Sequence, residues 1–107
     1  MSESTHISVH INRNVAEVYR YASNVENLEH WAAGVSPEME IRFAKNNYFG
    51  VLDHWATIDG KTFYNPMRVI EDGPGTSEVV FTLRDATEED QAAVAADLAT
   101  LKRVLEG

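Results

Sequence analysis

Apolar and polar residues alternate strictly over residues 5–11. Ile7, Val9 and Ile11 fall on one side of this segment, and the residues between them are polar. A period of two is typical of a strand with one face buried and the other in water. We therefore predict a half-buried strand here.

Two short helices are predicted to follow this strand. Asn14 stands three residues before Glu17, which is close to the spacing of a capping box at a helix N-terminus. Apolar residues then recur at helical spacing up to residue 22, and a second segment, capped at residues 23–24, reaches Trp31. Gly34 and Pro37 are expected to end it.

The middle of the chain predicts four strands, over residues 38–45, 48–58, 61–70 and 77–84. Asp59-Gly60 is a strong signal for a two-residue type I′ turn. Asn46-Asn47 is interpreted as another two-residue turn. The connection over residues 71–76 is expected to be longer and looser.

A long helix is predicted at the C-terminal end. Thr87 is a suitable N-cap, and the three acidic residues at 88–90 suit the positive end of the helix dipole. The order of elements is then β-αα-ββββ-α, an α+β arrangement in which one curved antiparallel sheet wraps on the long helix, within a single domain over residues 1–107. The helix carries one apolar stripe, formed by Val94, Leu98, Leu101 and Leu105.

The two turns put the same apolar set on one face of the sheet, because opposite residues in antiparallel strands point the same way. The turn at 59–60 pairs His54 with Asn65, and the turn at 46–47 pairs Ile41 with Leu52. A slip of one residue would bring charged side chains such as Asp53 inward instead. The predicted inward face is Met39, Ile41, Phe43, Leu52, Ala56, Phe63, Met67, Val69, Val79, Phe81 and Leu83, interrupted by His54 and Asn65.

His54 and Asn65 are the most informative polar pair on this face. One interpretation is a proton-transfer or hydrogen-bonding pair in a cavity wall, because an imidazole with a near-neutral pKa suits acid–base work. The other is a buried histidine whose ring is satisfied by Asn65 or by backbone. The larger apolar side chains allow the same two interpretations, a ligand cavity or a packed core; they are Tyr19, Trp31, Met39, Phe43, Phe63, Met67 and Phe81.

The outward face of the predicted sheet carries a contiguous group of aromatic and aliphatic residues. Trp55 lies opposite Tyr64, and Phe49 lies opposite Ile70, among charged neighbours. A contiguous apolar group on a surface is typical of an interface, and Trp and Tyr are enriched at interface centres. We therefore expect self-association as a homodimer.

Charge and composition narrow the possible partners. The chain of 107 residues has 9 Lys and Arg against 17 Asp and Glu, a formal charge of −8, and its basic residues are scattered. Nucleic acid and membrane surfaces are therefore not expected as partners. There is no cysteine, and the sequence indicates no metal site and no cofactor. Without a secretory signal pattern, a cytoplasmic location is the expectation.

Several segments resemble the START/Bet v 1-like superfamily, also called SRPBCC or polyketide cyclase/dehydrase-like. Residues 6–19 resemble its first strand and helix, and Asn24-Val-Glu-Asn-Leu-Glu-His-Trp31 resembles its second helix. Phe49-Gly-Val-Leu-Asp-His-Trp55, with residues 66–69 and 77–83, resembles small bacterial members, and residues 87–105 match the long last helix. The resemblance implies a helix-grip fold with a cavity for apolar small molecules. Members usually have six strands after the helix pair, whereas four are predicted here, so the fold is expected to be shortened.

Three functions follow as expectations. The first is binding of an apolar or aromatic metabolite, the second is a homodimer with a filled cavity, and the third is a polyketide cyclase or dehydratase-type enzyme with His54 as acid–base. Dense core packing favours the second, and an open cavity that reaches His54 favours the other two. The candidate ligand-binding residues are His54, Asn65, Met39, Leu52, Phe63, Met67, Phe81 and Leu98.

Overall fold

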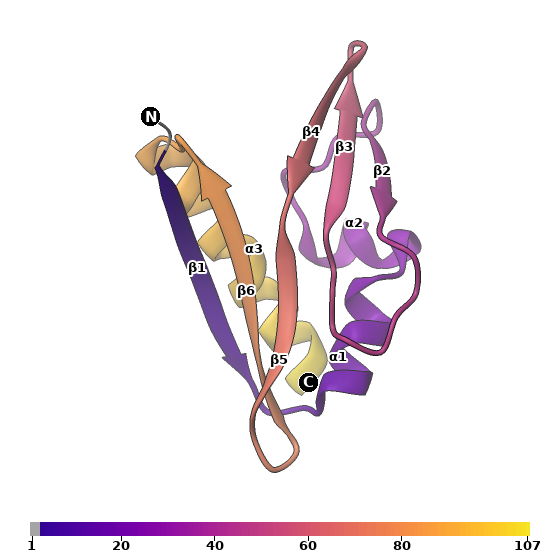
Figure 1. The fold of residues 1–107 in the computed structure, drawn as a ribbon, viewed down its shortest axis with the longest axis vertical. Coiled ribbons are helices and arrows are strands. Elements are labelled where there is room, and N and C mark those ends of the chain that lie inside the picture. The colour runs from indigo at the N-terminus through magenta and orange to yellow at the C-terminus, as the bar shows by residue number, and fades with distance from the viewer. Residues whose placement is uncertain (1–2) are drawn as a thin grey trace.

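The computed structural model describes residues 3–107 and arranges them as strands on one side and helices on the other (Figure 1). One turn of 3-10 helix, η1 (Val25–Asn27), leads directly into α2, so the second predicted helix is a composite. The elements in chain order are β1 (Ser4–Ile11), α1 (Val15–Ala22), η1 (Val25–Asn27), α2 (Leu28–Trp31), β2 (Glu40–Phe43), β3 (His54–Ile58), β4 (Lys61–Asn65), β5 (Met67–Gly73), β6 (Thr76–Arg84) and α3 (Glu88–Glu106).

The strands form two antiparallel three-stranded sheets, with the orders β1-β6-β5 and β2-β3-β4. The segment before β3 connects them, because Val51 forms a bridge with Arg68 of β5. Leu52 N–H also donates to the Met67 carbonyl at 2.9 Å. The strands therefore make one curved surface, as expected, but in two halves that lean apart (Figure 1).

Local sequence signals account for the element ends that were predicted correctly. Asp59 and Gly60 both have positive φ, 51° and 76°, as a type I′ turn requires, and the pairing of β3 with β4 is the predicted one. Asn14 accepts from the Glu17 N–H at 2.8 Å. Thr87 forms a full capping box with Asp90 at the start of α3.

The predicted turn at Asn46-Asn47 is wrong. Ile41 pairs with Ala56 rather than with Leu52, a register displaced by four residues, so a loop replaces the turn and the first part of the predicted strand 48–58. Asn47 folds this loop on itself, because its side chain accepts from two backbone N–H groups and donates to two carbonyls. An even displacement leaves every side chain on its predicted face.

Two other connections also differ from the prediction. The predicted strand 61–70 divides at Pro66 into β4 and β5, since proline has no N–H to give to a ladder. The next N–H, that of Met67, donates to the Asp53 carboxylate at 2.9 Å. The connection after β5 is tighter than predicted, because β5 and β6 stay paired up to Gly73 and Thr76. Five strands, not four, therefore follow the helix pair among the described residues.

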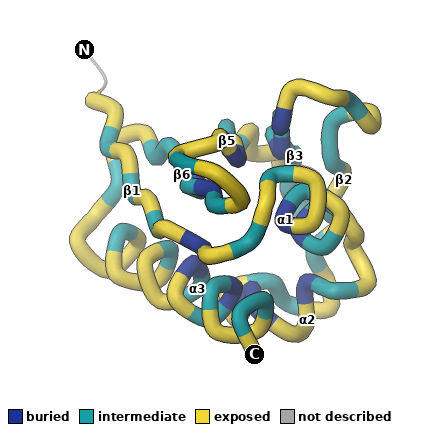
Figure 2. The backbone as a smooth tube through the Cα atoms, turned by 90° about the horizontal axis from the view of Figure 1, so that it is seen from below, coloured by how far each residue is buried: buried dark blue, intermediate teal, exposed yellow. Residues whose placement is uncertain are grey.

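The core lies between α3 and the half formed by β1, β6 and β5. Figure 2 shows α3 and α2 on one side and the strands on the other, with buried positions between them. Phe63, predicted to face inward, is 53% exposed because it belongs to the half that leans away. The buried apolar residues are Ile11, Val18, Ala22, Leu28, Trp31, Ala32, Leu52, Met67, Val69, Val79, Leu98 and Leu101.

Candidate functional site

A cavity of about 610 Å³ lies between the two halves of the sheet, α2 and α3. It exists because β4 diverges from β6 beyond the hydrogen bond from Thr82 N–H to the Pro66 carbonyl, so side chains from both strands face a shared space. The volume falls within the range of small-molecule sites, about 300–1,000 Å³. Its walls are mostly apolar and include Phe43, Ala56, Phe63, Phe81, Leu83, Val94 and Leu98.

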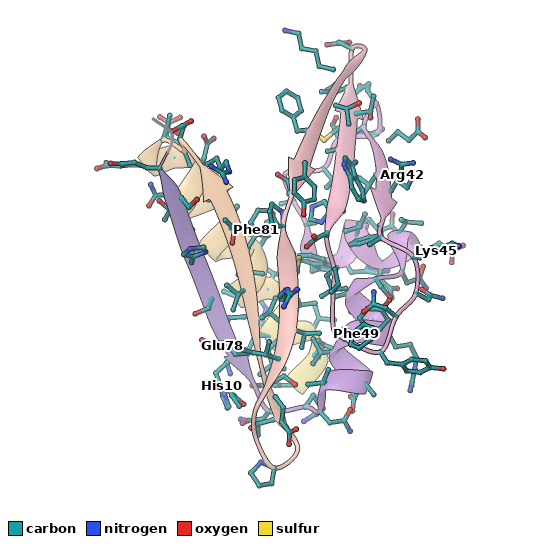
Figure 3. The ribbon with its side chains drawn as sticks, in the orientation of Figure 1. His10, Arg42, Lys45, Phe49, Glu78 and Phe81 are labelled. Carbon is teal, nitrogen blue, oxygen red and sulfur yellow. The ribbon has the colours of Figure 1, made fainter. Side chains whose placement is uncertain are left out.

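His54 stands in the sheet wall of this cavity between two phenyl rings. Its ring centroid lies 5.3 Å from that of Phe43 and 5.7 Å from that of Phe81, the latter edge to face. Phe43 is its partner across β2 and β3, and Phe81 reaches inward from β6 (Figure 3). The cavity therefore has an aromatic wall with one imidazole in its centre.

The protonation state of His54 follows from its surroundings. Nδ1 lies 3.1 Å from the Leu52 carbonyl oxygen, which only accepts, so we assign the ring proton to Nδ1 and a free lone pair to Nε2. Burial lowers the pKa of His54 below its ordinary value, against smaller raising effects of the Leu52 carbonyl and the Asp53 charge. His54 is therefore a neutral hydrogen-bond acceptor at pH 7.

Trp31 lies in the helical wall of the cavity, at the end of α2, and is only 5% exposed. Its indole Nε1 is buried and has no hydrogen-bond partner. A buried donor without a partner costs about 1–3 kcal/mol. Trp31 therefore contributes to the cavity wall, while its indole N–H remains a buried donor without a partner.

The α3 wall is acidic. Asp97 accepts a hydrogen bond from the Ala33 N–H at 3.1 Å, which holds α3 to the loop after α2. Burial raises the pKa of Asp97 above its ordinary value, although backbone N–H groups of Ala33 and Gly34 oppose the shift. Asp90 lines the same wall, with its carboxylate engaged in the cap of α3.

Six of the eight predicted ligand-binding residues line the cavity: His54, Asn65, Met39, Phe63, Phe81 and Leu98. Leu52 and Met67 do not. They are both 1% exposed and fill the core at the point where the two halves of the sheet still pair, below the divergence that opens the cavity. Asn65 lies opposite His54 as predicted, but the His54 ring bonds to backbone instead of to Asn65.

The sequence prediction missed Asp97 entirely and the free indole N–H of Trp31. Asp97 had a usable signal, because it stands three residues after Val94 and four before Leu101 and so shares their inward stripe. The indole N–H had none. Its lack of a partner depends on the loop after α2, which no periodicity describes.

Two other histidines, His6 and His10 of β1, form hydrogen bonds with side chains of other strands. His6 Nδ1 lies 2.8 Å from the Thr82 hydroxyl, and His10 Nδ1 lies 2.5 Å from the Asp72 carboxylate.

Within residues 3–107 no three His, Cys, Asp or Glu side chains gather as metal ligands would. No helix in this part of the chain is long and apolar enough to cross a membrane.

No protein-family model and no curated protein matches the sequence, but solved structures match the fold. A point mutant of norcoclaurine synthase from Thalictrum flavum, in complex with a transition-state analogue, superposes with a TM-score of 0.69 at 10% identity, over 99% of this chain and 95% of that one. CalU16 from Micromonospora echinospora gives 0.70 at 14% identity, over 99% and 76%. The Zhui aromatase/cyclase from Streptomyces sp. R1128 gives 0.58 at 10%, over 99% and 94%.

These structures match almost the whole chain with a divergent sequence. Curved antiparallel strands, a helix pair and a long C-terminal helix are therefore common to all of them, as the sequence resemblance implied. The chain therefore has the same α+β fold as norcoclaurine synthase and the Zhui aromatase/cyclase, with curved antiparallel strands and a long C-terminal helix.

Proposed function

We propose that the protein binds an apolar, aromatic small molecule in the cavity between β4, β6 and α3. The observation that carries this proposal is the aromatic wall of an open volume, in which the Phe43 and Phe81 rings lie 5.3 Å and 5.7 Å from the His54 ring. A packed core would close this volume with side chains. Aromatic walls with a few polar groups are typical of ligand sites.

The shape of the wall favours a flat ligand. Edge-to-face and offset contacts between rings contribute about 0.5–1.5 kcal/mol beyond the burial of area, and Phe81 already adopts an edge-to-face contact with His54. Burial of apolar surface on both partners supplies the remaining driving force, at roughly 25 cal/mol per Å². The half-exposed Phe63 lies at the rim, where a ligand would cover it.

The test is a fluorescence or calorimetric titration with 2-ethylnaphthalene, a flat apolar probe. Ala56→Phe fills the cavity wall and is expected to weaken binding at least about tenfold. Thr57→Phe is the matched control, because the neighbouring position in β3 faces the other side of the sheet. Equal loss in both variants, or no binding to the wild-type protein, would contradict the proposal. Native mass spectrometry of protein from its own host would then identify any retained ligand.

A homodimer through the outer face of β3 and β4 is the second candidate. Trp55 and Tyr64 stack there at 5.3 Å, and the Arg42 guanidinium lies 5.1 Å from the Trp55 ring. Phe49 is 81% and Ile70 is 41% exposed, and Figure 3 shows Phe49 further down the same flank of the molecule as Arg42. Because the face carries charges of both signs, a second copy related by a two-fold axis can place cations against anions.

Sedimentation at micromolar concentration tests the dimer. Trp55→Glu is expected to shift the protein to a monomer, whereas Ser8→Glu, on the exposed side of β1, is expected to leave the mass unchanged. A wild-type monomer would contradict this candidate.

A further inference from the structure

His54 offers the cavity a hydrogen-bond acceptor that no protein group uses. Within residues 3–107 the hydrogen bond of its ring joins Nδ1 to the Leu52 carbonyl oxygen at 3.1 Å, and Nε2 has no partner. The side-chain nitrogen and oxygen atoms that are both buried and unpaired in this part of the chain are Trp31 Nε1 and Ser36 Oγ. His54 Nε2 is not one of them, so this unpaired atom keeps accessible surface.

The direction of the Nε2 lone pair follows from the bond on the other side of the ring. Nδ1 is directed towards Leu52, which is 1% exposed and lies in the core where the two halves of the sheet pair. The two nitrogens of an imidazole point to different sides of the ring, so Nε2 points away from this core. Because His54 lines the cavity, the accessible surface of Nε2 belongs to the cavity.

The His54 ring is also held in this orientation. Nδ1–H donates to the Leu52 carbonyl, and the Phe43 and Phe81 rings lie 5.3 Å and 5.7 Å from the imidazole. A fixed acceptor loses little conformational freedom when a ligand binds. Asn65 lines the cavity directly opposite His54, but within the described residues no hydrogen bond fixes its amide. His54 is therefore the better organised acceptor of the pair.

The apolar wall decides which donor suits this acceptor. A charged group that enters the wall loses hydration that phenyl rings do not replace, and a carboxylate also meets Asp90 and Asp97 in the lining. A hydroxyl on an aromatic ring donates a hydrogen bond without bringing a charge. It lies in the plane of its ring, so one flat molecule can contact the phenyl rings and reach Nε2.

We propose that His54 Nε2 selects an aromatic ligand with a phenolic hydroxyl, by accepting a hydrogen bond from that hydroxyl. The inference rests on the proposed function, since it assumes that an aromatic molecule occupies the cavity. A phenol, with a pKa of about 10, is a far weaker acid than an imidazolium whose pKa lies below 6.5. The hydroxyl therefore keeps its proton, and the role of His54 is recognition.

Nuclear magnetic resonance of the wild-type protein tests the lone pair directly. Long-range ¹H–¹⁵N spectra distinguish a protonated imidazole nitrogen from one with a lone pair, and His54→Phe identifies the His54 signals. 2-Naphthol is expected to move the Nε2 signal upfield, as a hydrogen bond to the lone pair requires. 2-Methylnaphthalene has a methyl group in place of the hydroxyl, and it is expected to leave the signal in place or move it downfield. His6, bonded to Thr82 outside the cavity, is the internal control.

Affinities give the second readout, as the ratio between the two probes. His54→Phe keeps an aromatic side chain but removes the acceptor, so it is expected to weaken 2-naphthol about three- to tenfold relative to 2-methylnaphthalene. Asn65→Leu is the matched variant at the opposite position in β4, and it is expected to leave the ratio unchanged. The wild-type spectra keep the test valid even where His54→Phe is poorly folded.

The outcomes separate the two proposals. The same Nε2 shift with both probes, or an unchanged ratio in His54→Phe, would overturn the selection of a hydroxyl and leave aromatic binding intact. A changed ratio in Asn65→Leu alone would overturn the role of His54. So would an Nε2 atom that carries the ring proton in the free protein, or that already accepts from the Trp31 indole N–H. Failure of both probes to bind would overturn aromatic binding and the role of His54 together.

Discussion

The two halves of the sheet consist of similar strands but differ in how deeply their inward side chains are buried. In the half formed by β1, β6 and β5, Val69 is 1% and Val79 is 0% exposed, and α3 packs on this half. In the half formed by β2, β3 and β4, Phe63 and Tyr64 are both 53% exposed. The first half holds the molecule together, and the second holds a wall of the cavity. Alternation along a strand tells which residues face inward, but not whether anything packs on them.

The joint between the halves is built from three residues. Pro66 interrupts one strand, and the Asp53 carboxylate accepts from the N–H of the following residue. Gly50 allows the other segment to approach β5, where the Gly50 carbonyl accepts from the Val69 N–H at 2.9 Å. Asp53 also accepts from the Tyr64 hydroxyl at 2.5 Å. The two halves therefore diverge at a fixed place, which is where the cavity begins.

The largest contrast is expected between core and wall truncations. Leu101→Ala, at a residue that is 0% exposed, is expected to cost about 2–5 kcal/mol in the free energy of unfolding. Phe63→Ala, at the half-exposed rim, is expected to cost about 1 kcal/mol or less, because little of its ring leaves water on folding. Urea unfolding measures both. Similar costs would mean that the cavity wall is packed as tightly as the core.

Adding one methyl group at Gly50, where the two halves of the sheet meet, is expected to destabilise the protein. A Cβ at Gly50 would lie 2.2 Å from the Val69 carbonyl oxygen at a φ of +71°, so Gly50→Ala is expected to cost about 2 kcal/mol or more. Gly75→Ala is the matched control, since its φ is +72° and nothing lies within 4 Å. It is expected to cost about 1 kcal/mol. Thermal or urea unfolding measures both variants. Equal midpoints for the two would show that the close approach to Val69 is not the reason for glycine at position 50.

A smaller effect is expected at the start of α3. Thr87→Ala removes the acceptor of the Asp90 N–H and is expected to cost about 1 kcal/mol of unfolding free energy. Thr100→Ala, in the middle of the same helix, removes only a bond to the Ala96 carbonyl and is expected to cost less. Circular dichroism during urea unfolding distinguishes them. A larger loss at Thr100 would contradict the role of the capping box.

The smallest expected effect is the pH dependence of the free energy of unfolding. It comes from one histidine in each half of the sheet, and its direction is opposite for the two. Hydrogen bonds to Asp72 and Asn12 raise the pKa of His10 above 6.5, so its stabilising contribution is complete below pH 6.5 and is lost as the pH rises through the raised value. Burial lowers the pKa of His54 below 6.5, so its contribution is present above pH 6.5 and is lost as the pH falls through the lowered value.

Nuclear magnetic resonance titration of the imidazole C–H signals measures both pKa values. Asp72→Asn is expected to move the His10 pKa back towards 6.5 and to leave His54 unchanged, because the two rings lie in different halves of the sheet. Movement of both pKa values in the same variant would show that the halves are electrostatically coupled.

Local chemistry made much of the fold predictable. Asn14, Thr87 and the pair Asp59-Gly60 each mark an element boundary through a bond or a φ value that only a few residue types supply. The loop between β2 and β3 was not predictable in the same way, because Asn47 folds it through four side-chain bonds that leave no periodic pattern in the sequence. The predicted inward face is still correct, only because the register of β2 and β3 is shifted by an even number of residues.

The site was predicted in part for the same reason. His54 and Asn65 followed from the register of one hairpin. The placement of Leu52 and Met67 in the core depends on where the halves separate, and this depends on how Asp53 and Pro66 meet in space. Such a contact between strands leaves no periodic signal in either segment.

The pairing of β1 with β6 has a consequence for the order in which the chain can fold. Ser4 pairs with Arg84, and Glu3 N–H bonds to the Asp85 carboxylate at 3.0 Å. The first strand of the described residues therefore pairs with β6, the last strand along the sequence. The hairpins β3–β4 and β5–β6 can form as soon as they are synthesised, because their contacts are local. During synthesis β1 must wait with an unpaired edge until residue 84 has left the ribosome, and closure of the sheet is therefore expected to be the late, slow step of folding.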